Sequence, residues 1–94
     1  MKNLLWYLLA GTRGGETRCR IIEFLQHHPS NAHSLSSALH LDYKTVRHHL
    51  AVLEKNNVII QVNKGNYGAV YFLSEPLKEH LGIFHEIWVR FGKK

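Results

Sequence analysis

Five side chains that can form hydrogen bonds with a nucleic acid lie within one six-residue stretch of the chain. They are Tyr43, Lys44, Thr45, Arg47 and His48. Long basic and polar side chains can reach base edges in a groove, and a threonine hydroxyl can donate to a phosphate oxygen. The nearest acidic residues are Asp42, directly before the stretch, and Glu54, further along the chain. The stretch therefore predicts a surface that contacts a polyanion.

The hydrophobic pattern places this stretch at the start of a helix that runs from Tyr43 to about Asn56. Val46, Leu50 and Leu53 recur at i, i+4 and i+7, which marks the buried side of that helix. The polar side chains listed above fall on the opposite side, near the helix start. His49 borders the buried side, so we expect it to pack or to contact a phosphate rather than to contact a base.

A second, shorter helix is predicted directly before this one, at residues 32–39. Asn31 and Asp42 are suited to cap the starts of the two helices, because their side chains accept hydrogen bonds from free backbone amides. Residues 40–41 form the tight break between them. The apolar face of the short helix is predicted to hold Leu35, Ala38 and Leu39.

Two more helices are predicted towards the N-terminus. Residues 3–10 are apolar on every side, so that helix must be buried on most faces. Residues 16–28 form the next helix, which Pro29 ends. Its buried stripe is predicted to contain Arg18, Ile21, Ile22 and Leu25.

A β-hairpin and a final helix are predicted after the polar helix. Residues 58–62 and 69–73 are rich in β-branched and aromatic residues, which is typical of strands. At the hairpin tip, Lys64, Asn66 and Tyr67 either contact a nucleic acid or form an ordinary exposed loop. Asn57 is expected in a left-handed conformation before the first strand. After the second strand, Ser74 or Glu75 caps one continuous helix with Pro76 in its first turn.

The order of these elements is that of a helix-turn-helix followed by a wing. Residues 35–59 also carry a recurrent pattern at Leu35, Leu39, Thr45, Val46, His49, Leu50, Leu53 and Val58. In this pattern the chain resembles the ArsR-like winged helix-turn-helix transcriptional regulators, although Arg47 replaces a common serine and Asn57 a common glycine. The resemblance implies a mainly α fold with a small β-hairpin and extra N- and C-terminal helices. It also implies a sequence-specific regulator that reads the major groove of double-stranded DNA with residues 43–56.

The composition agrees with one small globular domain. The 94 residues are divided into an N-terminal helix (1–11), a winged-helix core (12–74) and a C-terminal dimerisation helix (75–94). The formal net charge of +5 permits binding to a polyanion without demanding it. Cys19 is the single cysteine, which suits a buried position in a cytoplasmic protein. The longest apolar run, residues 4–10, is much shorter than the roughly 20 residues that cross a membrane.

The end helices predict a homodimer. Their candidate interface residues are Leu5, Trp6, Leu9, Leu77, Leu81, Phe84, Ile87, Trp88 and Phe91. A winged-helix core of about 60 residues has too little surface to cover all of these side chains, and an exposed apolar patch of that size is unusual for a monomer. The alternative is that the N-terminal helix covers the C-terminal helix of the same chain.

Other classes of function find less support in the sequence. Phosphate-binding and nucleophile-elbow motifs are absent, so neither an enzyme nor a cofactor is expected. No metal site is expected either, because His80 and His85 point apart on a helix and residues 27–33 straddle Pro29. The rivals to DNA binding are a protein–protein module in a larger transcription or replication assembly and an RNA-binding winged helix. The sequence does not determine whether the protein has a small-molecule effector.

Overall fold

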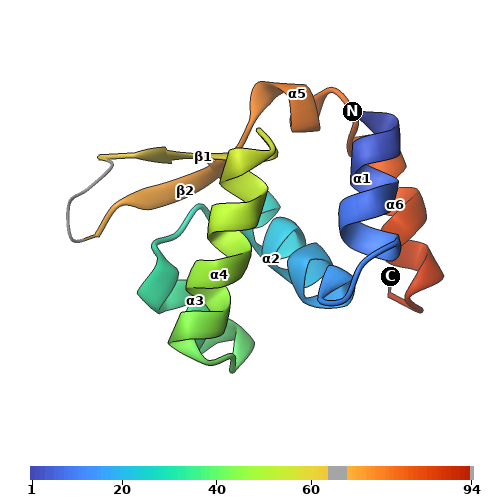
Figure 1. Cartoon of the computed structure of the whole chain (residues 1–94). Helices are drawn as coiled ribbons and strands as arrows, with labels where there is room; N and C mark the ends of the chain where they lie inside the picture. The colour runs from blue at the N-terminus through green and yellow to red at the C-terminus, as the bar shows by residue number, and fades with distance from the viewer. Residues whose placement is uncertain (64–67, 94) are drawn as a thin grey trace.

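The computed structural model describes residues 1–63 and 68–93, and these form helices and one two-stranded antiparallel sheet (Figure 1). The elements are α1 (Lys2–Ala10), α2 (Gly15–His27), α3 (Ala32–Leu39), α4 (Tyr43–Lys55), β1 (Ile59–Val62), β2 (Val70–Leu73), α5 (Glu75–Lys78) and α6 (Leu81–Arg90). This is a winged helix-turn-helix with extra helices at both ends, as the sequence predicts. None of the described helices is long and apolar enough to cross a membrane.

The two predicted caps begin α3 and α4. The side chain of Asn31 accepts a hydrogen bond from the backbone amide of Ser34 at 2.8 Å. Asp42 accepts one from the amide of Thr45 at 3.2 Å. Each cap satisfies an amide that has no partner inside its own helix, so both helices start where the sequence predicts.

The turn between α3 and α4 is closed through Ser36. His40 takes a left-handed conformation (φ 55°), and the next amide, that of Leu41, donates back to the Ser36 carbonyl at 3.0 Å. The Ser36 hydroxyl donates in turn to the Leu41 carbonyl at 2.6 Å. These two bonds fix the angle at which α4 leaves α3.

The core lies between α2, α3, α4 and the sheet, and α1, α5 and α6 extend it. Val46, Leu50 and Leu53 are buried on the inner side of α4, as predicted. Leu35 is buried on α3, but the prediction for Ala38 is wrong, because Ala38 is exposed and Ala32 is buried instead. Leu39, the third predicted residue, is half-buried and packs against the core, so α3 contacts the core through Ala32, Leu35 and Leu39.

The hairpin is tied to the rest of the fold at both of its ends. Its register pairs Ile59 with Leu73 and Val62 with Val70. Asn57 precedes β1 in the predicted left-handed conformation, with φ at 59°. In the other strand, the amide of Tyr71 donates to the carbonyl of Ser30 at 2.8 Å. The wing is therefore anchored to the segment between α2 and α3.

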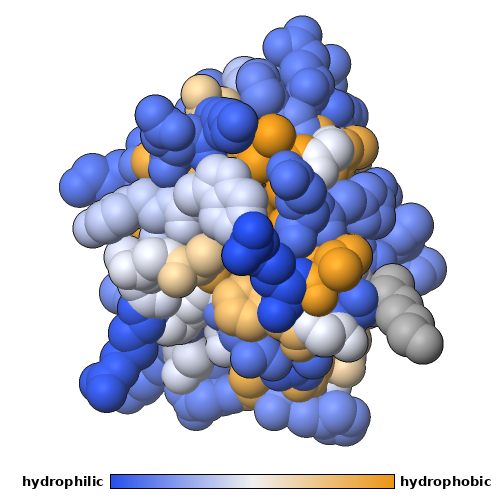
Figure 2. All heavy atoms as spheres, turned by 90° about the vertical axis from the view of Figure 1, so that its right-hand side faces the viewer, coloured by the Kyte–Doolittle hydropathy of each residue, from blue (hydrophilic) through white to orange (hydrophobic). Residues whose placement is uncertain are grey.

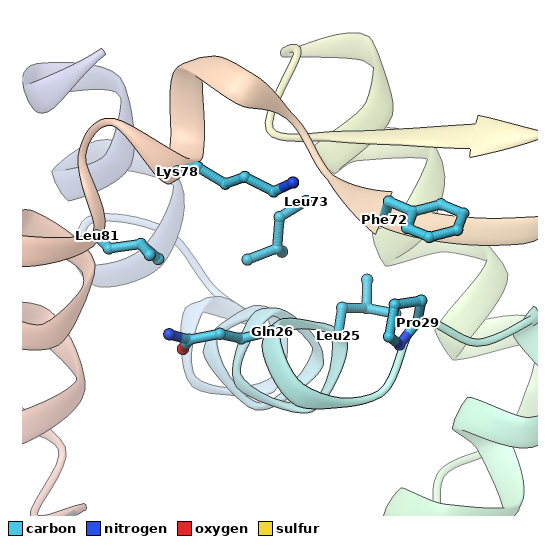
Figure 3. A pocket seen from close by; sticks show the side chains of 7 residues that line it. All are labelled: Leu25, Gln26, Pro29, Phe72, Leu73, Lys78 and Leu81. Carbon is cyan, nitrogen blue, oxygen red and sulfur yellow. The ribbon is translucent and has the colours of Figure 1, made fainter.

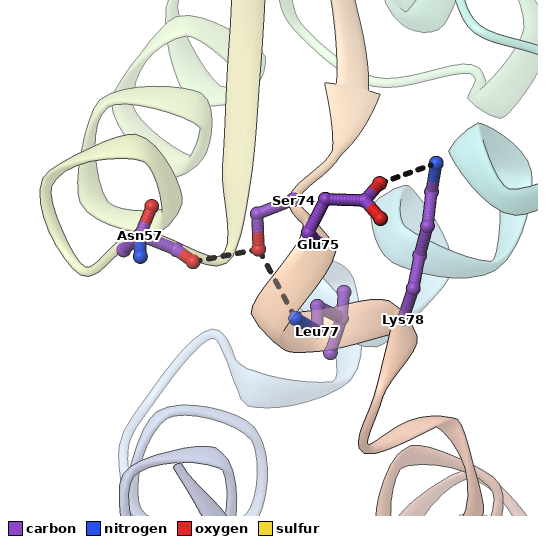
Figure 4. A network of polar contacts seen from close by, with 5 residues as sticks. All are labelled: Asn57, Ser74, Glu75, Leu77 and Lys78. Atoms are coloured by element: carbon purple, nitrogen blue, oxygen red, sulfur yellow. Dashed lines mark hydrogen bonds and ion pairs between the residues drawn. The ribbon is translucent and has the colours of Figure 1, made fainter.

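Ser74 joins the end of α4 to the start of α5 (Figure 4). Its buried hydroxyl donates to the carbonyl of Asn57 at 2.8 Å and accepts the amide of Leu77 at 3.1 Å. Of the two predicted caps for this helix, Ser74 is the one used. The ion pair between Lys78 and Glu75 (3.1 Å) lies on the exposed side of the same turn, where it adds little stability.

The prediction of one continuous C-terminal helix is wrong, because the chain bends at residues 79–80 between α5 and α6. The backbone of His80 is not helical, and its amide bonds to the Leu77 carbonyl at 2.8 Å in a tighter turn. The ring nitrogen Nδ1 of His80 lies 2.8 Å from the Pro76 carbonyl, which gives that carbonyl a partner in the bend. The bend lets Leu77 enter the core while α6 packs against α1.

The structure also corrects the predicted dimer surface. Five of its nine residues are fully buried within the single chain, namely Leu5, Leu9, Leu77, Phe84 and Ile87. These side chains follow the alternative prediction, in which the N-terminal helix covers the C-terminal helix of the same chain, since α1 packs against α6 (Figure 1). The other four remain half-buried and keep some surface for a partner: Trp6, Leu81, Trp88 and Phe91.

A shallow cavity of about 220 Å³ lies where the winged-helix core meets the C-terminal helices (Figure 3). Its lining comes from α2, β2, α5, α6 and Pro29, and includes no residue of α3 or α4. The buried amide oxygen of Gln26, one of the lining residues, has no hydrogen-bond partner. The cavity is therefore separate from the polar face of α4.

Candidate nucleic-acid interface

The exposed face of α4 carries all five polar side chains that the sequence singled out. Tyr43, Lys44, Thr45, Arg47 and His48 are each exposed, whereas Val46, His49 and Leu50 beside them are buried. A helix with this division can enter a groove with one side and keep its packing with the other. The capping bond of Asp42 also occupies part of the nearest carboxylate.

His33 is an additional candidate that sequence reasoning missed as a nucleic-acid contact. It lies exposed in the first turn of α3, and its ring meets the ring of Tyr43 edge-on, with centroids 5.8 Å apart. The contact limits where the Tyr43 ring can point. The sequence signal is weak, because these residues come together only through the crossing of α3 and α4.

Tyr71 links the wing to the same face and was also missed. It is buried in β2, and burial raises the pKa of its phenol, while the nearby Arg47 guanidinium acts in the opposite direction. A second link joins β1 to α4, where the Gln61 side-chain amide donates to both carboxylate oxygens of Glu54 at 2.9 and 3.0 Å. The wing and α4 thus form one continuous surface. Alternate residues of a strand point to opposite faces of the sheet, so the alternation in residues 70–73 could have identified Tyr71 as an inward-facing residue.

The tip of the wing lies outside the described residues. The predicted contacts at Lys64, Asn66 and Tyr67 therefore remain predictions. The candidate interface that the structure describes consists of α4, the first turn of α3 and the base of the wing.

Beneath this interface, His49 packs into the core and contacts the buried Arg18. Its side chain is only 7% exposed, and its Nδ1 atom lies 3.1 Å from an Arg18 guanidinium nitrogen. Burial lowers the pKa of His49, and the Arg18 and His48 charges lower it further. The expectation that His49 does not contact a base agrees with this position.

Among residues 1–63 and 68–93, no group of three or more His, Cys, Asp or Glu side chains lies close enough to hold a metal ion. Burial, with Glu16 nearby, raises the pKa of the Cys19 thiol to about 12. The thiol therefore stays protonated at neutral pH and behaves as a small apolar side chain, as predicted.

Many DNA-binding transcription regulators have a helix-turn-helix whose second helix, the recognition helix, exposes a polar side to the major groove. Comparison with protein-family models identifies the family. The model described as "Bacterial regulatory protein, arsR family" matches residues 15–61, which is half of the chain. The chain therefore belongs to the ArsR family.

Several solved structures share the fold of this chain. The apo-Zalpha domain of zebrafish PKZ has 26% identity and a TM-score of 0.61, over 68% of this chain and all of that domain. A variant of ZitR from Lactococcus lactis has 14% identity and a TM-score of 0.64, over 96% of this chain and 74% of its own. FabT from Streptococcus pneumoniae, solved in complex with DNA, has 21% identity and a TM-score of 0.60, over 94% of this chain and 70% of the FabT chain. Curated protein sequences give no significant match.

Proposed function

We propose that the chain is a sequence-specific transcription regulator that binds double-stranded DNA as a homodimer and acts in the cytoplasm. The observation that carries this proposal is the division of α4 into an exposed polar half and a buried apolar half. The FabT structure, a protein of the same fold bound to DNA, supports the type of partner.

In this proposal the first two turns of α4 enter the major groove. Arg47 is placed to read a base, because its planar guanidinium can donate two hydrogen bonds to the edge of guanine. Lys44 and Thr45 lie closer to the helix start and contact phosphates. Tyr43, held at its edge by His33, and His48 complete the surface. The wing lies alongside, with Lys64, Asn66 and Tyr67 as its proposed contacts with the DNA backbone or minor groove.

The proposed dimer uses the face formed by α1 and α6. Tyr7 and Val89 are 62% and 61% exposed on this face. Figure 2 shows hydrophobic and weakly polar side chains near the centre of this face, with a strongly hydrophilic side chain among them and hydrophilic residues around them. The Arg90 guanidinium lies 5.1 Å from the centre of the Trp6 ring, and both aromatic residues and arginine are enriched at protein interfaces.

A two-fold axis through this face predicts the form of the DNA site. Two copies of α4 would enter successive major grooves on one side of the duplex. The site should therefore be a palindrome with half-sites about 34 Å apart, which is one helical turn.

Selection of bound duplexes from a random pool tests the proposal. The full chain should enrich one palindromic sequence, and this sequence should remain bound when mixed genomic fragments compete in a gel shift. Binding that every fragment competes away equally would contradict sequence-specific regulation. Binding to no nucleic acid would favour the rival protein–protein module, and preference for RNA would favour an RNA-binding winged helix.

A further inference from the structure

The recognition helix is attached to the N-terminal part of the chain through a buried arginine. Arg18 on α2 is only 4% exposed. Its guanidinium donates to the Leu8 carbonyl from two nitrogens, at 3.0 and 2.8 Å, and to the Arg13 carbonyl at 3.2 Å. It also contacts the Thr12 hydroxyl and, at 3.1 Å, Nδ1 of His49. All of these acceptors are neutral groups, so the fold contains a buried cation whose hydrogen bonds span α1, the loop after it, and α4.

The contact with Arg18 defines the state of the His49 ring. A guanidinium has donors and no acceptor, so Nδ1 of His49 must offer its lone pair and the ring proton must lie on Nε2. Protonation of His49 would remove that lone pair and would place a second cation 3.1 Å from the first. The observed geometry is therefore available only to the neutral imidazole.

The loop between α1 and α2 closes over this pair. Gly14 has a φ of +86°, and a Cβ atom there would lie 2.7 Å from Cε1 of His49 and 3.2 Å from Nη1 of Arg18. A Cβ on Gly15 would lie 2.1 Å from the carbonyl oxygen of Leu9. Gly14 therefore allows the loop backbone to lie directly against the pair, and Gly15 allows the start of α2 to lie against the end of α1.

The charged and titratable groups around His49 all oppose its protonation. Arg18 faces it from α2, and the His48 ring lies 5.3 Å from it on α4. The α1–α2 loop faces it with the backbone of Gly14, which carries no charge. The side chains of Cys19 and Tyr7 lie near Arg18, on α2 and α1. Burial and these neighbours lower the pKa of His49.

We propose that Arg18 and His49 are positioning residues for DNA binding, and that their contact makes the DNA affinity sensitive to protons. Neutral His49 holds α4 against α2 and the α1–α2 loop, so that the exposed side of α4 keeps the orientation that fits a groove. Protonated His49 repels Arg18, α4 loses this attachment, and the DNA is released. This inference rests on the proposed function, because it concerns the same helix.

The test compares the dissociation constants of the full chain for its selected duplex at about pH 7.5 and about pH 5.5. The informative variant is His49→Asn, whose Oδ1 occupies the place of Nδ1 and accepts from Arg18 without being protonated. For each protein the acid ratio is the dissociation constant at the lower pH divided by that at the higher pH. We expect the parent's acid ratio to exceed that of His49→Asn by at least about fivefold, the lower end of typical coupling between two sites.

An exposed histidine outside the proposed DNA-binding surface provides the control. His27→Asn removes a histidine from the last turn of α2 and should retain the acid loss that His49 causes. Equal acid ratios for the parent and His49→Asn, with both folded by circular dichroism at both pH values, would overturn the inference.

An NMR titration without DNA separates this outcome from failure of the proposed function. Backbone amide signals of α4 should shift together with the titration of the His49 ring in the parent, and this shift should be absent in His49→Asn. If no duplex is selected at neutral pH, the proposed function fails. If the α4 amide signals do not shift with the titration of the His49 ring, the inference fails whether or not the chain binds DNA.

Discussion

The two ends of the molecule expose surfaces of different character. At one end α4 and the wing present Lys44, Arg47 and other polar side chains, whereas at the other end α1 and α6 expose Tyr7 and Val89 (Figures 1 and 2). Both α4 and α6 bury one side against the same core. The difference therefore lies in what each helix leaves outside: basic and polar side chains on α4, and an aromatic and an aliphatic side chain beside charged ones on α1 and α6.

The largest expected effect tests whether α6 belongs to the core of the single chain. Phe84→Ala should lower the free energy of unfolding by about 3–5 kcal/mol, because its fully buried ring leaves a cavity. The control Glu86→Ala removes an exposed side chain from the same helix and should change stability by less than about 0.5 kcal/mol. Urea denaturation measures both. A similar small loss for both variants would mean that α6 is not packed in the core.

The next effect tests the polar end. Arg47→Ala should weaken binding to the selected duplex by about 1–3 kcal/mol and relax the choice of sequence, because a base contact is lost. Lys55→Ala is the matched control, since it removes one exposed cation from the last turn of the same helix. Lys55→Ala should cause a smaller loss of DNA affinity, and this loss should be equal for all DNA sequences. Fluorescence anisotropy with the selected duplex and single-mismatch duplexes measures this, and equal losses would show that α4 contributes only charge.

A smaller effect tests the apolar end. Val89→Glu places a charge on the α1/α6 face and should raise the dimer dissociation constant by about tenfold, or about 1.4 kcal/mol. Ile60→Glu introduces the same charge at an exposed position of β1, at the other end of the molecule, and should leave the mass unchanged. Sedimentation equilibrium gives the mass of each. A parent that sediments as a single subunit at micromolar concentration would rule out the dimer.

The smallest effect concerns stability against acid. The pKa of His49 is lowered on folding, so the unfolded chain binds this proton more readily than the folded chain. Neutral His49 contributes fully to the free energy of unfolding above the pKa of about 6.5 that a histidine has in the unfolded chain. This contribution decreases as the pH falls towards the lower pKa of His49 in the folded chain, by at most about 1.4 kcal/mol per pH unit. Urea midpoints between neutral and mildly acid pH should decrease less for His49→Asn than for the parent. An identical decrease would mean that another group causes the acid sensitivity.

Sequence reasoning was accurate for several features that depend on one helix or one turn, although it placed Ala38 in the core by the same reasoning and was wrong there. The caps at Asn31 and Asp42, the left-handed Asn57 and the buried side of α4 all follow from spacing within a few residues. The exposed positions of Tyr43, Lys44, Thr45, Arg47 and His48 follow from the same periodicity. Their contact with DNA remains a prediction, since exposure alone does not select a partner.

The errors share one physical cause, which is packing between segments far apart in the chain. Periodicity showed that Leu5, Leu9 and Phe84 are apolar, but it did not contain the information that α1 covers α6 in the same chain. It also favoured a continuous helix through His80, because nothing local forbids one. The bend there brings Leu77 into the core.

The amino-acid sequence by itself determined the order of the elements, their caps and which side of α4 faces solvent, because these depend on backbone hydrogen bonds and side-chain spacing within one or two turns. The tertiary structure decided which side chains meet: His33 with Tyr43, and Arg18 with His49 across 31 positions of sequence. It also decided that a buried arginine finds only neutral acceptors. Such contacts depend on how whole helices cross, and that crossing is set by the packing of the entire core rather than by any one segment.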